Sequence, residues 1–294
     1  MGTQHRLGKT LGMAIMILGI GGCATVDPEQ AARRELLSNA AHDCQRQYPF
    51  VSSFSFDRFD QLSWFYRETA SRAERDQFVS CYRARVSELT KTAAASTAPS
   101  GTAGVPSGSA MAAAPPDAWA RAPTWKVGDE WTYRWESPRG SGTFVRRVSS
   151  EEIMDGIECY VITSGRNRLY FRKADLAWVM QLAGWRIVYQ YTPPRQEVVW
   201  PLHVGRTWEQ LYVQDQPERR LTENFLRLSR VEASERVAVP AGTFDAFKIV
   251  VRSKYSNAVV RQYWVSRDVR NVVRWEEYHD YGVEKQDLTA FSLN

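Results

Sequence analysis

The C-terminal part of the chain, residues 123–294, carries many short runs in which large apolar side chains alternate with polar ones. Trp131, Tyr133 and Trp135, for example, are separated by single polar residues. A period of two is the pattern of a strand with one buried face. About a dozen such runs with short turns and no long amphipathic helix predict a mainly β, antiparallel fold. Because a sheet of that many strands has edges to hide, we expect a half-open or closed β-barrel-like domain.

The first 23 residues have the layout of a secretory signal. Arg6 and Lys9 form a basic start without acids, and an apolar run of ten residues, 11–20, follows. The run is too short to cross a bilayer as a helix, which takes about 20 apolar residues. It has the length of a signal-peptide core. A plain secretory signal cut nearby and a short buried helix are the alternatives to a lipoprotein signal.

The segment Ile20-Gly21-Gly22-Cys23 resembles the lipobox of bacterial lipoprotein precursors. The resemblance implies that residues 1–22 are a signal peptide and that Cys23 is lipidated, with fatty-acyl chains such as palmitate. Several acyl chains give a stable anchor, because each buried CH₂ contributes about 0.8 kcal/mol. Ala24, where retention at the inner membrane would need Asp, implies the periplasmic face of the outer membrane. The expected partner is therefore the membrane, through this lipid anchor.

Residues 23–91 predict a small helical module. We expect a first helix from Asp27 and Pro28, a short helix near 58–69, and a third helix opened by a capping box of Ser71 and Glu74. Cys44 and Cys81 each lie on the apolar side of a helix. In an oxidising periplasm they can form a disulfide that closes a 37-residue loop, worth about 4 kcal/mol in the chain-entropy model. Two buried free thiols are the alternative.

Residues 92–122 predict a flexible linker. From 92 to 116, Ala, Ser, Thr, Pro and Gly fill every position except Val105 and Met111, and no residue is charged. Such a composition cannot form a core. The expected domains are therefore the signal peptide (1–22), the helical module (23–91), the linker (92–122) and the antiparallel β domain (123–294). We expect the two folded parts to move independently.

The segment Val127-Gly128-Asp129-Glu130-Trp131 recurs 77 residues later as Val204-Gly205-Arg206-Thr207-Trp208. Glycine can take the positive φ of a turn, and the tryptophan then opens a strand that faces the core. Two interpretations fit: two similar strand entries, or a pseudo-repeat of two sheet halves.

These VGxxW segments, together with VPAGTFDAFKI (239–249), RQYWVSRDVRNVVRWE (261–276) and DLTAFSL (287–293), resemble an uncharacterised family of secreted bacterial β-domains. That family is distantly similar to the half-open barrels of periplasmic lipoprotein carriers, which hold acyl chains. The resemblance implies a fold and, by analogy alone, an interior that can shelter a lipid.

The sequence contains no known catalytic or metal-binding pattern. It has no GxSxG elbow, Walker loop, HExxH segment or cysteine pair with zinc spacing. We therefore expect no enzyme, no catalytic residue, no cofactor and no metal. An envelope hydrolase assembled across strands is the alternative, with His203, His279 and Asp280 as its candidates. Cys159 alternates with apolar neighbours and fits a core position.

Charge and aromatic content indicate the partner. Lys+Arg is 38 and Asp+Glu is 33, and the arginines are scattered among acids, which argues against nucleic acid. Nine of the 11 tryptophans lie in residues 123–294. They can line a groove for acyl chains or simply build the core. We predict a non-catalytic binding or scaffold module that shelters an acyl lipid or binds an envelope protein. The candidate groove residues are Trp131, Tyr133, Trp135, Trp185, Tyr189 and Trp264.

Overall fold

The computed structural model describes residues 28–56, 62–67, 69–96, 119, 121–254 and 256–294. The predicted signal peptide, Cys23 and most of the predicted linker lie outside these residues, so lipidation of Cys23 stays a prediction.

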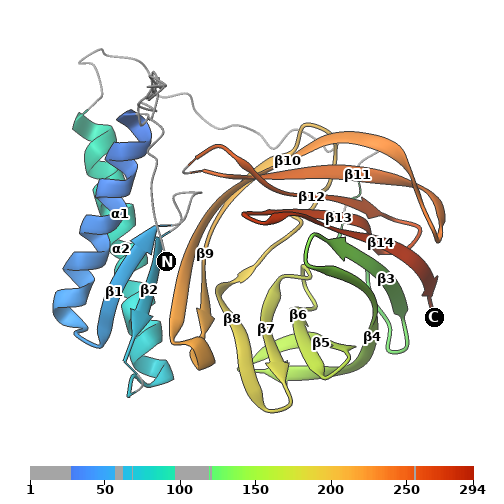
Figure 1. The fold of residues 1–294 in the computed structure, drawn as a ribbon, viewed down its shortest axis with the longest axis horizontal. Helices are drawn as coiled ribbons and strands as arrows, with labels where there is room; N and C mark the ends of the chain where they lie inside the picture. The colour runs from blue at the N-terminus through green and yellow to red at the C-terminus, as the bar shows by residue number, and fades with distance from the viewer. Residues whose placement is uncertain (1–27, 57–61, 68, 97–118, 120, 255) are drawn as a thin grey trace, which may run out of the picture.

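Twelve strands of the described chain form a closed antiparallel barrel (Figure 1). Each strand pairs with the next along the chain, β14 pairs with β3, and β9 pairs with β10 over ten residue pairs. Closure leaves the ring without a free edge, so the expectation of a barrel-like domain is confirmed. The strands are β3 (Glu130–Ser137), β4 (Gly140–Met154), β5 (Ile157–Ser164), β6 (Asn167–Arg172), β7 (Trp178–Ala183), β8 (Arg186–Arg195), β9 (Thr207–Gln216), β10 (Leu221–Val239), β11 (Gly242–Ser253), β12 (Val259–Ser266), β13 (Asn271–His279) and β14 (Gly282–Ser292). A short 3₁₀ turn, η1 (Pro217–Arg219), joins β9 to β10.

The N-terminal module has the order α1 (Pro28–Gln47), β1 (Val51–Phe56), β2 (Leu62–Tyr66) and α2 (Arg72–Ser96). The capping box at α2 is confirmed, since the Glu74 N–H donates to Ser71 Oγ and the Ser71 N–H donates to a Glu74 carboxylate oxygen. The helix continues five residues past the expected boundary at 91.

The expected short helix near 58–69 is wrong, because Leu62–Tyr66 forms a strand. Leu62, Trp64 and Tyr66 alternate along it and are buried, whereas Phe65 is largely exposed. The aromatic run is compatible with either structure, and the pairing of β2 with β1 and β10 decides for the strand.

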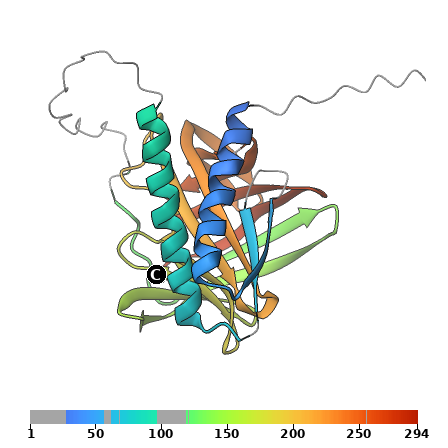
Figure 2. The ribbon, with the colours of Figure 1, turned by 90° about the vertical axis from the view of Figure 1, so that its left-hand side faces the viewer.

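The module is joined to the barrel. Strand β2 pairs with β10 from Leu221↔Phe65 to Glu223↔Ser63, and the barrel residues Val213 and Leu226 pack into the module's core. Figure 2 shows α1 and α2 side by side in front of the barrel. The expectation of independent motion is therefore wrong, because the module shares both a sheet and a core with the barrel.

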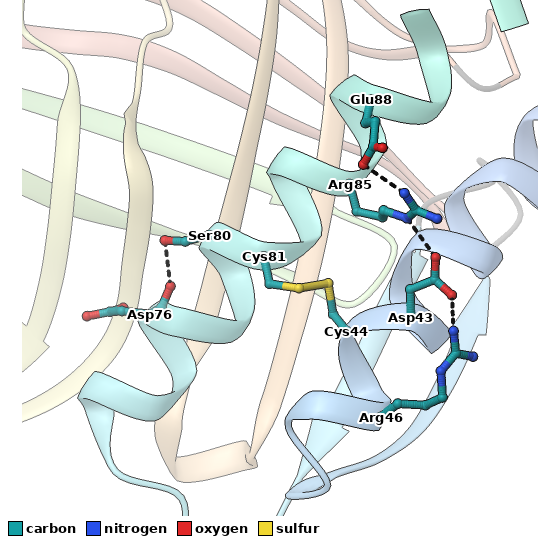
Figure 3. The surroundings of a disulfide bond; sticks show 8 residues. All are labelled: Asp43, Cys44, Arg46, Asp76, Ser80, Cys81, Arg85 and Glu88. Atoms are coloured by element: carbon teal, nitrogen blue, oxygen red, sulfur yellow. Dashed lines mark hydrogen bonds and ion pairs between the residues drawn. A yellow bond between two sulfur atoms is a disulfide. The ribbon is translucent and has the colours of Figure 1, made fainter. Parts of the chain in front are cut away.

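A disulfide between Cys44 and Cys81 ties α1 to α2 across a separation of 37 residues, as predicted (Figure 3). Beside it, the Asp43 carboxylate accepts hydrogen bonds from Arg46 on its own helix and from Arg85 on α2 at 2.6 Å. The Arg85 guanidinium lowers the pKa of Asp43. The covalent and ionic links thus lie next to each other on the two helices.

The two VGxxW segments have the same local backbone. Gly128 has φ +97° and Gly205 has φ +87°, a region that favours glycine. The Gly128 N–H donates to the Val148 carbonyl at 2.8 Å, and the Gly205 N–H donates to the Val231 carbonyl at 2.9 Å. Each turn leads the chain into a strand, β3 or β9, that pairs with the next strand, β4 or β10.

The irregularities of the ladders repeat as well. Register shifts follow Val148 in the β4–β5 pair and Val231 in the β10–β11 pair. Further shifts follow Tyr170 in the β6–β7 pair and Trp264 in the β12–β13 pair. Of the two interpretations of the VGxxW segments, these equivalences support a pseudo-repeat whose halves are β3–β8 and β9–β14.

Candidate ligand cavity

The barrel contains a partly open cavity of about 270 Å³. Strands β4, β5 and β6 of the first half and β12, β13 and β14 of the second contribute to its wall. Two covering segments, 123–125 and 198–200, also line it. A backbone bridge holds these segments together, because the Trp119 N–H donates to the Leu202 carbonyl at 2.8 Å and the reverse bond is 2.9 Å. The aromatic lining residues are Trp125, Phe171, Trp178, Trp200, Tyr263 and Trp275.

A cluster of four charged side chains closes one side of this cavity. The Arg261 guanidinium contacts Glu197 at 3.3 Å and Glu277 at 2.6 Å, and Arg195 forms a further ion pair with Glu197. Burial would raise the pKa of Glu277, but Arg261 and Arg195 outweigh it and lower the pKa to about 2. The Glu277 carboxylate is therefore ionised and paired at neutral pH.

A second cavity, of about 450 Å³, lies beyond the cluster, and Arg261 and Glu277 line it as well. Its wall is polar. The Gln214 and Gln216 amides both donate to the Glu223 carboxylate, at 3.0 and 2.6 Å. The four-charge cluster thus separates an aromatic cavity from a polar one.

Arg146 on β4 lines the aromatic cavity. Its guanidinium carbon lies 5.2 Å from the centroid of the Phe144 ring and 5.5 Å from that of Tyr133. Within the described part of the chain, the Arg146 side chain makes no hydrogen bond and no ion pair. Burial lowers the pKa of this arginine, because a cation among aromatic rings loses hydration.

Two further donors of this wall lack a protein acceptor among the described residues. They are Nε1 of Trp200 and Nε of Arg195, whose side chain is only 8% exposed. No buried side-chain acceptor of the same cavity wall is left without a donor in the described chain.

The six candidate groove residues do not come together in this cavity, and none of them lines it. Trp131, Tyr133 and Trp264 are buried in the neighbouring core. Trp135 lies over Gly142, and Trp185 is 89% exposed between β7 and β8. Tyr189 lines the polar cavity instead.

The candidate residues chosen from the sequence did not include Arg146, although the alternation of residues along β4 points to it. Arg146 stands in phase with Phe144 and Val148, so a charged residue occupies a position of the strand that otherwise faces inward. Arg261, in phase with Tyr263, carries the same signal.

The residues considered for catalysis lie on two separate segments of the chain. His203 lies between β8 and β9, whereas His279 ends β13 and Asp280 follows it directly. The His279 ring stacks on Tyr281 at 4.7 Å. Adjacent Glu276 and Glu277 point to opposite faces of β13, since Glu277 pairs with Arg261 and Glu276 with Lys285. Cys159 is a buried free thiol, and burial raises its pKa to about 11.

The described residues contain no group of three or more His, Cys, Asp or Glu residues that could hold a metal ion. Neither helix of the described chain combines the length and apolarity that a membrane crossing requires.

No protein-family model and no curated protein matches this chain. Among solved structures, it is similar to a "putative lipoprotein" from Parabacteroides distasonis (13% identity, TM-score 0.31, covering 59% of this chain and 99% of that one). It is also similar to a "putative exported protein" with a YmcC-like fold from Bacteroides fragilis (13%, 0.35, 59% and 99%). A third is the "hypothetical lipoprotein YmcC" from Escherichia coli (10%, 0.31, 55% and 83%). At TM-scores below 0.5 these likenesses carry no argument about function.

Proposed function

We propose that the protein is a lipid-anchored component of the bacterial envelope that binds one acyl-chain amphiphile, without catalysis, in the aromatic cavity. The observation that carries the proposal is the partly open cavity of about 270 Å³ with six aromatic side chains in its wall. Small-molecule sites are concave, mostly apolar and contain a few placed polar groups, and this wall has that composition.

The size of the cavity restricts the ligand. Small-molecule pockets in proteins usually measure about 300–1,000 Å³. A cavity of about 270 Å³ lies at the low end of that range, which suits one chain of medium length and not a two-chain phospholipid.

The proposed anchor would hold the barrel close to the bilayer. Lipidated Cys23 would be five residues from Pro28, where α1 begins. Five residues span at most about 18 Å. The N-terminal module shares a sheet with β10. The short connection to the anchor would therefore keep the barrel, as well as the helices, close to the bilayer.

Quenching of tryptophan fluorescence tests the ligand. The full mature chain with Cys23→Ser, prepared without detergent, is titrated with dodecanoate brominated in its chain. Four tryptophans line the cavity, so we expect saturable quenching with one ligand per chain. Val198→Trp, which fills the cavity from a covering segment, should abolish it. Absence of quenching, or quenching unaffected by Val198→Trp, would contradict the proposed function.

Labelling tests the anchor separately. Cells that express the protein are grown with radiolabelled palmitate. The wild-type chain should incorporate the label and fractionate with membranes, and Cys23→Ser should do neither. If wild type and Cys23→Ser distribute equally between the membrane and soluble fractions, the proposed lipid anchor is wrong. That result would not bear on ligand binding in the cavity.

A further inference from the structure

We infer that the ligand of the aromatic cavity carries a single carboxylate, and that Arg146 binds this group while the apolar body lies among the aromatic side chains. The inference rests on the proposed function and adds the charge of the ligand and the residue that selects it.

The Arg146 cation lines the cavity beside two aromatic rings. Phe144 and Tyr133 stack on each other with their centroids 5.4 Å apart, and the Arg146 guanidinium carbon lies 5.2 and 5.5 Å from these centroids. The rings hold the side chain in place but do not neutralise it, because they offer a quadrupole and no formal charge. A half-buried guanidinium of this kind is suited to an anion with two oxygens in a plane.

The acidic side chains of the same wall already form ion pairs with other arginines. Asp175 pairs with Arg172 at 2.6 Å, and Glu277 pairs with Arg261 at 2.6 Å. Glu197 is shared by Arg195 and Arg261. No carboxylate that lines the cavity is therefore available to Arg146 without breaking an existing ion pair.

The buried side-chain atoms of this wall that lack a hydrogen-bond partner among the described residues are all donors. Trp200 Nε1 and Arg195 Nε are donors without an acceptor among the described residues. Buried donors are costly unless they meet an acceptor. A carboxylate supplies only acceptors, whereas an ammonium or a second guanidinium would add donors to a wall that already has too many.

The pseudo-repeat shows which residue occupies the position of Arg146 in the other half of the barrel. Arg146 lies directly opposite Trp131 in the β3–β4 pair, and Ser229 lies directly opposite Trp208 in the β9–β10 pair. The two positions are equivalent, because each precedes by two residues the valine that bonds the VGxxW turn. Since the second half is built with serine there, the backbone does not require arginine at this position.

The experiment compares a charged and a neutral ligand of the same chain length. Brominated dodecanoate and brominated 1-dodecanol are titrated at pH 8 into the full mature chain with Cys23→Ser, and quenching gives the two dissociation constants. The cavity variant is Arg146→Ser, which introduces the residue of the other half. Arg146→Lys keeps the charge without the planar fork. Arg147→Ser is the matched control, because Arg147 lies on the outer face of the same strand with 60% of its side chain exposed.

We expect the unsubstituted cavity and Arg147→Ser to bind dodecanoate at least tenfold more tightly than dodecanol. Arg146→Ser should lose this preference while binding dodecanol as before, and Arg146→Lys should retain part of it. Equal binding of the two ligands, or a preference that survives Arg146→Ser, would overturn the inference while the proposed function stands. Failure of both ligands to bind the unsubstituted cavity would overturn the proposed function as well. If Arg146→Ser does not fold, Arg146→Lys and the ligand preference of the unsubstituted cavity decide.

Discussion

The two halves of the barrel share a backbone plan and differ in the charged groups that they contribute to the interior. In the first half, Arg146 faces the aromatic cavity, and the equivalent residue of the second half is Ser229. In the second half, Arg261 and Glu277 lie opposite each other at the β12–β13 hairpin. Their equivalents at the β6–β7 hairpin are Asn167 and Ala183.

The comparison of the two halves separates the features that the barrel architecture requires from those that it does not. The glycine turns, the tryptophan that follows each turn and the register shifts recur in both halves, so they belong to the architecture. Arg146 of the first half and the Arg261–Glu277 pair of the second half each have uncharged equivalents in the other half. The shared backbone therefore does not require these charges, and we propose that Arg146 serves to select a ligand.

The largest effect is expected at the shared tryptophans. Trp131→Ala and Trp208→Ala should each lower the free energy of unfolding by about 3–5 kcal/mol, because each removes a large side chain from a core. Trp131→Ala should lower the free energy of unfolding by about 1 kcal/mol more than Trp208→Ala, because it also removes a hydrogen bond. The Trp131 side chain is fully buried and its Nε1 donates to the Val269 carbonyl at 2.8 Å, whereas Trp208 Nε1 has no acceptor among the described residues. Chemical denaturation measures both, and a larger loss at Trp208 would contradict the equivalence as described.

A pH-dependent effect on stability is expected at Glu277 in the second half. The pKa of Glu277 is about 2 in the folded chain, against 4.5 for an unperturbed glutamate. A lowered folded pKa gives stability that is present above about pH 4.5 and is lost as the pH falls toward 2. The stability difference between wild type and Glu277→Gln should therefore shrink by about 2 kcal/mol between pH 5 and pH 2, part of the pKa effect being screened at a side chain that is 31% exposed.

Urea unfolding at pH 5, 4, 3 and 2 measures that difference. Glu218→Gln is the control, because Glu218 and its partner Arg186 form an exposed ion pair of little energetic weight. A difference between wild type and Glu277→Gln that stays constant over this range would show that the Arg261–Glu277 pair does not stabilise the fold.

The smallest effect is expected at the two glycines of the repeated turn. Gly128→Ala and Gly205→Ala should each cost about 1 kcal/mol, because an alanine at positive φ is strained. Gly128→Ala should lower the free energy of unfolding slightly more than Gly205→Ala. The new Cβ at position 128 would lie 2.2 Å from the Asn294 side chain, whereas nothing lies within 4 Å of a Cβ at position 205. Thermal and urea unfolding measure the pair, and a stabilising substitution at either position would contradict a shared turn.

The sequence predicts the barrel because alternation shows directly which residues share a face. Trp131 and Tyr133 alternate over β3, and the same pattern recurs along the chain. The capping box predicts the start of α2 for a similar reason, since Ser71 and Glu74 act within one turn of helix. Local patterns of this kind need no knowledge of distant partners.

The parts that sequence reasoning missed depend on distant partners. Leu62–Tyr66 becomes a strand because β10, more than 150 residues later, pairs with it. Alternation places Arg146 on an inward face but does not show that a cavity remains there, because the wall combines β4 with β12 and β13. The Arg261–Glu197 contact joins residues 64 positions apart.

The most direct test of the central claim is a crystal structure of the mature chain with Cys23→Ser grown with dodecanoate. We predict a single chain of density in the cavity between Trp178 and Trp275, with its carboxylate within hydrogen-bonding distance of the Arg146 guanidinium. A cavity that holds only ordered water at saturating dodecanoate, or a ligand with its carboxylate turned away from Arg146, would contradict the account.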